Sequence, residues 1–385
     1  MRILLLILFA LPLSAVTAAD TVPLVQPINV SLKKELQHAI DKGTKWLEAR
    51  QNPAGFWTTP EYPALTALVL TSLRGNPAAL PHDKDPEFIR KGYAFLLSCA
   101  QPDGGIYKKD LYNYNTSISI MALLAANNPD YNDVILKARN YVIGCQANLK
   151  NKTGPEKMYD GGIGYGDDDH YSDLSNTVMA LEALYYSKPL VQGKELTNAK
   201  DLNWPAAMGF IQRCQNLTAY NKEPWASDDP QNKGGFLYRP NDSSHAGAVT
   251  LPSGKIALRS YGSMSYDGLL SYIYADLKPD DPRVLAVQEW LRNNYSVDEN
   301  PGMKKDGLYY YYHTMAKALS TSGVNRLKLK NGSTINWRED LARKLLDEQK
   351  NEGFWVNTSG RWWEKDPVLV TSYALIALEI IHRGL

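Results

Sequence analysis

Two kinds of apolar segment alternate along the chain. The first kind, such as KGTKWLEARQ at 42–51, carries apolar residues on one side and Lys, Arg or Glu on the other, which predicts an amphipathic helix. The second kind, such as YPALTALVLTSL at 62–73, is apolar at nearly every position, as expected for a helix that is buried on all sides. A glycine–aromatic turn at 54–57 joins the two. The pattern therefore predicts a helical hairpin with one half-exposed and one buried helix.

This hairpin recurs six times, and its buried members lie at 62–73, 114–126, 172–184, 261–277, 306–320 and 369–381. Six hairpins that close into a ring bury every inner helix and leave no open end, whereas an open solenoid needs polar capping repeats, and the sequence contains no such repeat. We therefore predict an all-α fold, an α/α toroid with inner and outer rings of helices. Glycine is expected at each interhelix turn, where it permits positive φ: Gly55, Gly105, Gly162, Gly235, Gly307 and Gly353.

The turn has a specific spacing. Gln51-x-x-x-Gly55-x-Trp57 is repeated at 349–355, with a tyrosine variant at 101–107. This spacing resembles the glutamine–tryptophan repeat of squalene and oxidosqualene cyclases, and the resemblance extends from about residue 33 to the end of the chain. It implies the α/α toroid shared by those cyclases and by the β subunits of protein prenyltransferases, together with chemistry on an isoprenoid or lipid-like ligand.

The N-terminus resembles a secretory signal. Arg2 precedes an apolar run from Ile3 to Leu13, and small residues follow at 16–18, which predicts a signal peptide over residues 1–19. The remainder, 20–385, is predicted to be a single toroid domain with insertions near 216–233 and 239–258. We expect an exported protein, periplasmic or secreted, with no membrane span after the signal is removed.

The charge and the cysteine content of the chain indicate which classes of partner to expect. The formal net charge is +1, from 42 basic and 41 acidic residues, which argues against nucleic-acid binding. The three cysteines lie near the ends of predicted helices and are expected to pack as buried thiols. An apolar small molecule or lipid is the expected ligand, no cofactor is implied, and a protein partner remains open.

Asp173 is the first candidate for acid chemistry. The segment Asp173-Leu174-Ser175-Asn176-Thr177 matches the start of the inner helix that carries the Asp-x-Asp-Asp-Thr acid motif in the resembling cyclases. Ser175 and Asn176 replace the central acid pair, and Asn cannot supply a proton. Asp173 is therefore interpreted as an N-cap whose carboxylate accepts from backbone N–H groups, with catalysis as the alternative.

His313 is the second candidate. Tyr311-Tyr312-His313-Thr314 resembles the segment that supplies the zinc-ligating histidine in prenyltransferases. The other ligand positions of that family are occupied by Arg259 and Tyr261, which do not ligate zinc well, so no metal site is predicted. Asp267 is expected to approach His313 across a central cavity and to form an acid–base pair with it.

The N-termini of the inner helices are expected to meet at one end of the cavity, where their N–H groups create a positive potential. Residues near these starts are predicted to line the cavity: Asn115, Ser175, Asn176, Tyr261, Tyr266, Tyr311 and Tyr312. The acidic run at 167–170 is interpreted as a solvated turn at the rim.

Three functional hypotheses remain open. The first is an exported single-toroid protein that binds or transforms an apolar ligand, with Asp173, Asp267 and His313 as the catalytic candidates. The second is a glycan-active lyase or hydrolase on the same fold, favoured by Trp225, Trp362 and Trp363 if these are exposed. The third is a non-catalytic binding or scaffold domain, which accounts for both altered motifs.

Overall fold

The computed structural model describes residues 29–166, 171–192, 201–241 and 243–385. The predicted signal peptide at 1–19 and the acidic run at 167–170 lie outside the described residues. None of the helices within these ranges is both long and apolar enough to cross a bilayer.

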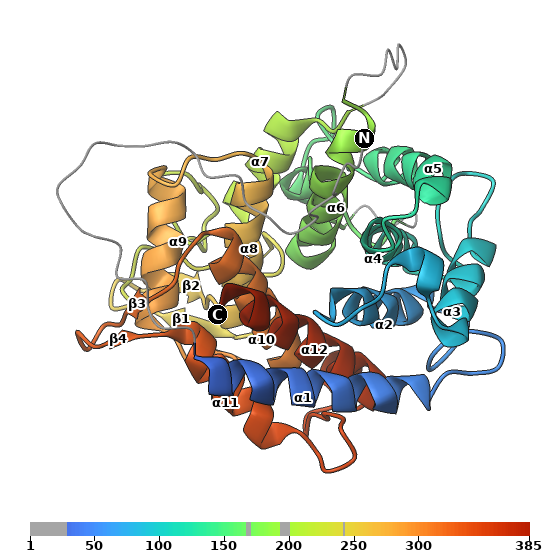
Figure 1. The fold of residues 1–385 in the computed structure, drawn as a ribbon. Coiled ribbons are helices and arrows are strands. Elements are labelled where there is room, and N and C mark those ends of the chain that lie inside the picture. The colour runs from blue at the N-terminus through green and yellow to red at the C-terminus, as the bar shows by residue number, and fades with distance from the viewer. Residues whose placement is uncertain (1–28, 167–170, 193–200, 242) are drawn as a thin grey trace.

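Six helices form a closed inner ring. Each contacts the next along the chain, and the last contacts the first. Figure 1 shows these six helices around a common centre. Their bounds are α2 (Pro63–Gly75), α4 (Tyr112–Ala125), α6 (Leu174–Ser187), α8 (Gly262–Tyr274), α10 (Leu308–Thr321) and α12 (Pro367–Gly384).

Six amphipathic helices surround this ring (Figure 1) and pack against it. They are α1 (Val30–Glu48), α3 (Glu87–Ser98), α5 (Asn132–Gly144), α7 (Trp204–Arg213), α9 (Pro282–Asn293) and α11 (Trp337–Glu348). The predicted all-α toroid is confirmed: the inner helices are buried along almost their whole length, and each outer helix buries one face. Single-turn helices occur between them, η1 (His82–Lys84), η2 (Pro129–Tyr131), η3 (Pro155–Tyr159), η4 (Lys188–Leu190) and η5 (Arg361–Trp363).

The turn glutamines join successive repeats. The side-chain amide of Gln51 donates to the carbonyl of Gly55 in its own turn and to that of Phe88 in α3. Gln349 donates to Gly353 and to Ala39 of α1, which closes the ring between the last and first repeats. Gln146 makes the corresponding pair of bonds to Gly161 and Asn203. Gln215 does the same with Gly234 and Arg283. Among the described residues the side chain of Gln101 bonds within its own turn, to Cys99 and Tyr107.

The turn glycines allow the next outer helix to approach closely. Gly353 has φ +105°, and a Cβ built there would lie 2.6 Å from the carbonyl oxygen of Lys42 in α1. The predicted glycine position is wrong by one residue in three repeats, where the first glycine of the pair has positive φ rather than Gly105, Gly162 or Gly235. The positive-φ residues there are Gly104, Gly161 and Gly234, each against a backbone carbonyl of the following outer helix.

The inner helices are capped from neighbouring segments. Asn115 of α4 accepts from Ala64 N at the start of α2, and Asn300 accepts from Ser263 N at the start of α8. The start of α10 is capped by Glu364, which precedes α12. Because the donors of one helix are satisfied by the segment next to it in the ring, capping reinforces the closure.

The two insertions pack together beside α7 and α8. The second contains an antiparallel hairpin, β1 (Ala248–Thr250) with β2 (Ile256–Leu258). Trp225 and Ala226 of the first insertion form a small apolar cluster with Leu237 and Leu258. A second hairpin, β3 (Leu327–Lys328) with β4 (Thr334–Ile335), connects α10 to α11.

Substituting Gly353 by Ala should destabilise the protein strongly, because the new Cβ meets the backbone of Lys42 and also forces an L-residue into positive φ. The matched control is Gly332→Ala, at φ +84° with no atom within 4 Å of the new Cβ. We expect the control to lose about 1–2 kcal/mol, the cost of left-handed backbone, and Gly353→Ala to lose at least about 2 kcal/mol more, as typical overpacking does. Urea denaturation measures the free energy of unfolding of both variants. Equal losses would contradict the prediction, because they would show that α1 can move away from the turn at Gly353 without cost.

Candidate functional site

One stripe on each inner helix faces the centre of the ring. On α4 the residues of this stripe are Tyr114, Ile118, Met121 and Ala125, of which Ile118 is the most buried, at 7% exposure. On α10 they include Tyr310, His313 and Lys317. This spacing of three and four residues selects one helical face, and because outer helices cover the opposite faces, the stripes line the interior of the ring.

Side chains meet across this interior. The hydroxyl groups of Ser175 on α6 and Tyr310 on α10 are 3.2 Å apart. About two helical turns further along the same helices, Lys317 forms an ion pair with Glu182, with Nζ–O distances of 2.6 and 2.7 Å. Since α8 separates α6 from α10 in the ring, these contacts bridge helices that are not neighbours.

A second bridge joins α4 to α12. Tyr114 and Tyr373 lie close enough to shift each other's pKa, and the ring of Tyr373 packs against those of Tyr310 and His313. The polar residues of the interior therefore form one connected group, the central cluster: Tyr114, Ser175, Glu182, Asp267, Tyr310, His313, Lys317 and Tyr373.

Asp267 is the buried acid of the central cluster. Its carboxylate Oδ2 accepts from the hydroxyl of Tyr310 at 2.8 Å, and its Oδ1 is buried with no hydrogen-bond partner among the described residues. Burial raises the pKa of Asp267 well above the usual aspartate range, against the lowering effect of the Tyr310 hydrogen bond and of Lys317. Burial therefore favours the neutral form of this carboxyl group.

His313 is neutral for a related reason. Burial and the nearby ammonium group of Lys317 hold its pKa well below the usual histidine range. Its Nδ1 is buried without a partner in the described part of the chain. No hydrogen bond between Asp267 and His313 is seen among these residues; Tyr310 occupies the place beside the carboxylate that the sequence assigned to His313.

The opposite wall of the interior is aliphatic. Leu65 and Leu68 on α2 keep exposures of 4% and 6%, while Ala64, Thr66 and Ala67 keep none. The corresponding residues on the neighbouring helices are Ile118 and Met121 of α4 and Leu369 and Ile376 of α12. The ring thus presents a mostly aliphatic wall from α12, α2 and α4, to which Tyr114 and Tyr373 add two hydroxyl groups, opposite a polar wall from α6, α8 and α10.

Asp173 lies at the start of α6 and outside the central cluster. Its Oδ1 accepts from Asn176 N at 2.8 Å and its Oδ2 accepts from Asn176 Nδ2 at 2.8 Å. The N-cap interpretation is confirmed. Burial raises the pKa of Asp173 to about 6, although the bonds from Asn176 oppose this shift.

Tyr311 and Tyr312 do not face the interior, which corrects the prediction. Their hydroxyl groups donate outward to Ser296 O and Val297 O in the segment after α9. Tyr266 packs against Tyr311 on the same side. Successive helical residues differ by about 100° in direction, so in the run of four tyrosines only Tyr310 shares the inward face of His313.

The remaining predicted lining residues occupy the helix starts. Asn115 is committed to capping, because its amide also donates to Asp110 O and Leu111 O. Asn176 is held by Asp173. Tyr261 is the buried residue that precedes α8. Of the seven predicted lining residues, Ser175 joins the central cluster through its hydrogen bond with Tyr310. The sequence did not predict four other members of the cluster, which are Glu182, Tyr310, Lys317 and Tyr373.

An aromatic rim covers the end of the ring where the inner helices begin. Trp362 and Trp363 are 44% and 49% exposed and have φ angles of 53° and 66°. Trp362 packs against His245 of the second insertion, and Trp363 packs against Tyr62, which precedes α2. The third tryptophan singled out from the sequence, Trp225, is buried in the insertion cluster, so its predicted exposure is wrong.

Glu364 holds this rim to α10. Its two carboxylate oxygens accept from Tyr309 N at 3.2 Å and Tyr310 N at 2.8 Å, and from Asn357 Nδ2 at 2.6 Å. Burial raises the pKa of Glu364 to about 7, even though these donors favour the charged form. These bonds anchor the residue that directly follows the two tryptophans, whose left-handed backbone is unfavourable for bulky residues.

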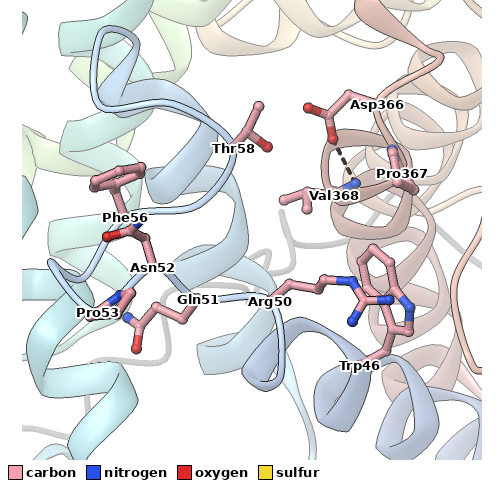
Figure 2. A pocket seen from close by; sticks show the side chains of 10 residues that line it. All are labelled: Trp46, Arg50, Gln51, Asn52, Pro53, Phe56, Thr58, Asp366, Pro367 and Val368. Carbon is pink, nitrogen blue, oxygen red and sulfur yellow. Dashed lines mark hydrogen bonds between the residues drawn. The ribbon is translucent and has the colours of Figure 1, made fainter.

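A separate surface groove of about 510 Å³ lies between the turn after α1 and the start of α12. Figure 2 shows residues 51–58 on one side, residues 366–368 on the other, and Arg50 beside Trp46 below them. Two of its polar side chains already have hydrogen-bond partners within the protein. Asp366 caps α12, and Gln51 donates to the carbonyl of Gly55 in its own turn. The groove is therefore a weaker candidate for a ligand-binding site than the central cluster.

The described residues contain no group of three or more His, Cys, Asp or Glu side chains arranged to hold a metal. At the positions that would supply the zinc ligands, Arg259 lies at the surface and donates to Gln231 Oε1, and Tyr261 is buried. His313 therefore has a different setting from the zinc ligand that its sequence context resembles.

No protein-family model and no curated protein sequence matches the chain. Among solved structures, the type II terpene cyclase MstE from Scytonema in complex with merosterolic acid A aligns with a TM-score of 0.52 at 12% identity, covering 93% of this chain and 100% of that one. Protein geranylgeranyltransferase-I of Candida albicans, complexed with GGPP, aligns at 0.54 and 17%, covering 89% and 90%. An inactive α-1,6-mannanase variant of Salegentibacter sp. with α-1,6-mannotriose aligns at 0.53 and 10%, covering 90% and 99%. At these identities the likeness shows the shared α/α toroid fold alone.

Infrared difference spectroscopy should detect the neutral carboxyl of Asp267. At pH 7 the difference between the wild type and Asp267→Asn is expected to contain the carbonyl stretch of a protonated acid, because burial disfavours the charged form. In Tyr310→Phe the band should shift without disappearing, since the hydroxyl that donates to this carboxyl is lost. A carboxylate band in place of the acid band would contradict the assignment.

Glu364 should make the rim sensitive to pH. Its folded-state pKa lies above the unfolded value, so the folded state binds the extra proton, and the free energy of unfolding falls as pH rises from about 5 to about 8. The contribution is on the order of 3 kcal/mol, since one pKa unit corresponds to about 1.4 kcal/mol. Denaturation of wild type and Glu364→Gln across this range checks it: the stability of the wild type relative to the variant should decrease with pH, and a constant difference would refute the shift.

Proposed function

We propose that this chain is an exported protein that binds an apolar, isoprenoid- or lipid-like ligand in the interior of its helical ring. The observation that carries the proposal is the division of the interior into a mostly aliphatic wall on α12, α2 and α4 and a polar wall that contains Asp267 and His313. Apolar sites with a few convergent polar groups are typical of small-molecule binding. Two of the structures with this fold are a terpene cyclase with its product and a prenyltransferase with GGPP, which supports the same class of ligand.

Asp267 is the group best suited to act on such a ligand. A buried neutral carboxyl can donate a proton or a hydrogen bond at pH 7, as an ionised surface aspartate cannot. The rings of Tyr310 and Tyr373 lie beside it and can stabilise a developing cation through their faces. Asp173 is a weaker candidate because both of its oxygens are occupied by Asn176.

Export rests on the sequence of residues 1–19, and we propose a periplasmic or secreted location on that basis. Binding of an apolar ligand outside the cytoplasm would suit transport or sequestration as well as catalysis. The non-catalytic binding role therefore belongs to the same proposal, and the reactivity of Asp267 separates the two.

A glycan-active enzyme is the second candidate. The observation that favours it is the exposed pair Trp362 and Trp363 at the end of the ring, together with the fold shared with a mannanase. Glycosidases need two carboxyl groups on either side of the scissile bond. In the central cluster Glu182 is paired with Lys317 and Asp267 is neutral, so the cluster favours the apolar ligand.

Native mass spectrometry with lipid extraction, on protein purified from its own host, tests the proposal. The wild type should carry an isoprenoid or other lipid. Ile376→Trp, which fills the aliphatic wall, should lose most of it, whereas Leu285→Trp, at a position 49% exposed on an outer helix, should keep it. A ligand-free wild type, or equal ligand content in the two variants, would refute binding inside the ring.

A further inference from the structure

This inference rests on the proposed function and concerns the chemical group that the ligand presents to the polar wall. We propose that the polar end of the ligand is a neutral oxygen, a hydroxyl or a carbonyl, and that Asp267 and His313 bind it. A diphosphate or carboxylate end is excluded by the charges around the cluster. This assigns a substrate class to the site that neither the fold nor the sequence motifs specify.

Two buried polar atoms in the cluster lack a partner. Oδ1 of Asp267 and Nδ1 of His313 have no hydrogen bond among the described residues, and their side chains are 0% and 6% exposed. Buried polar groups are nearly always hydrogen-bonded, and an unpaired one costs about 1–3 kcal/mol. In the proposed complex the polar group of the ligand satisfies these two atoms.

The neighbouring hydroxyl groups belong to the same network. Tyr310 donates to the other oxygen of Asp267, and its hydroxyl lies 3.2 Å from that of Ser175. An acid that is held neutral offers both an O–H donor and a carbonyl acceptor, and a neutral imidazole also offers one donor and one acceptor. A hydroxyl or carbonyl oxygen is satisfied by such groups without any net charge.

The only cation of the central cluster is already neutralised. Lys317 contacts both carboxylate oxygens of Glu182, at 2.6 and 2.7 Å. His313 carries no charge because its pKa is lowered by burial and by Lys317. An anionic head placed here would face Glu182 and the carboxyl of Asp267 with no uncompensated positive charge, and burying an unpaired charge is very unfavourable.

The helix N-termini do not supply positive charge either, which revises the potential expected from the sequence. The starts of α6, α10 and α12 are capped by the carboxyl groups of Asp173, Glu364 and Asp366. The other three are capped by protein oxygens: Asn115 Oδ1 for α2, Tyr165 O for α4 and Asn300 Oδ1 for α8. A phosphate group would have to displace these acceptors before it could use the N–H groups.

Binding of three ligands that share one chain separates the possibilities. Farnesol, farnesoic acid and farnesyl diphosphate are titrated into delipidated wild-type protein below their aggregation limits, with quenching of intrinsic fluorescence as the readout and calorimetry as confirmation. We expect farnesol to bind at least 10-fold more tightly than either anion. Tighter or equal binding of an anion overturns the neutral-end inference while leaving the proposed function intact. Failure of all three to bind contradicts the proposed function itself.

Charge variants test the reason for the selectivity. Glu182→Gln removes the counter-charge of Lys317 and should raise the affinity for farnesoic acid relative to farnesol at least 10-fold. The matched control is Glu289→Gln on the outer helix α9, which should leave the ratio unchanged. Asp267→Asn keeps a neutral donor and acceptor and should bind farnesol within a few-fold of wild type, whereas Asp267→Leu should weaken it 10-fold or more. Circular dichroism verifies that each variant is folded; a folded Glu182→Gln protein with an unchanged ratio would overturn the charge argument.

Discussion

Four of the turn glutamines hold successive hairpins together, because each makes hydrogen bonds to two repeats at once. A helical hairpin has one buried helix that it cannot cover alone, so each repeat needs its neighbour. The amide of Gln51 or Gln349 satisfies a carbonyl in its own turn and another on the next outer helix. This sets the spacing between hairpins, and the glycine beside it permits backbone contact. Because the bond from Gln349 reaches Ala39, the same device closes the ring.

Closure has a consequence for the interior. Six helices around a centre cannot all bury their inward faces against one another, so their side chains must meet across the ring. The helices α6, α8 and α10 contribute a serine, a tyrosine, a buried aspartic acid and one ion pair, whereas α12, α2 and α4 contribute mainly aliphatic residues, together with Tyr114 and Tyr373. The low polarity of this setting raises the pKa of Asp267 and lowers the pKa of His313, and so favours the neutral form of both. An interior that suppresses charge in its own side chains is suited to a ligand of the same character.

The aromatic rim lies at the end of the ring where the inner helices begin. Trp362 and Trp363 adopt an unfavourable backbone conformation, and the bonds from Glu364 to the start of α10 hold them there. The segment thus links the exposed rim to the helix that carries Tyr310 and His313.

The sequence by itself determined the architecture. Helical periodicity, the apolar inner segments and the glutamine–glycine–tryptophan spacing are local properties, and they predicted six hairpins, a closed ring and the cap at Asp173. Only the tertiary structure decided which side chains meet. In the run Tyr309 to Tyr312 each residue is chemically alike, and the rotation of α10 against its neighbours selects Tyr310 for the interior while Tyr311 and Tyr312 anchor the outer layer. The pairing of Lys317 with Glu182 joins residues 135 positions apart, and no local pattern specifies it, because such contacts arise from ring closure.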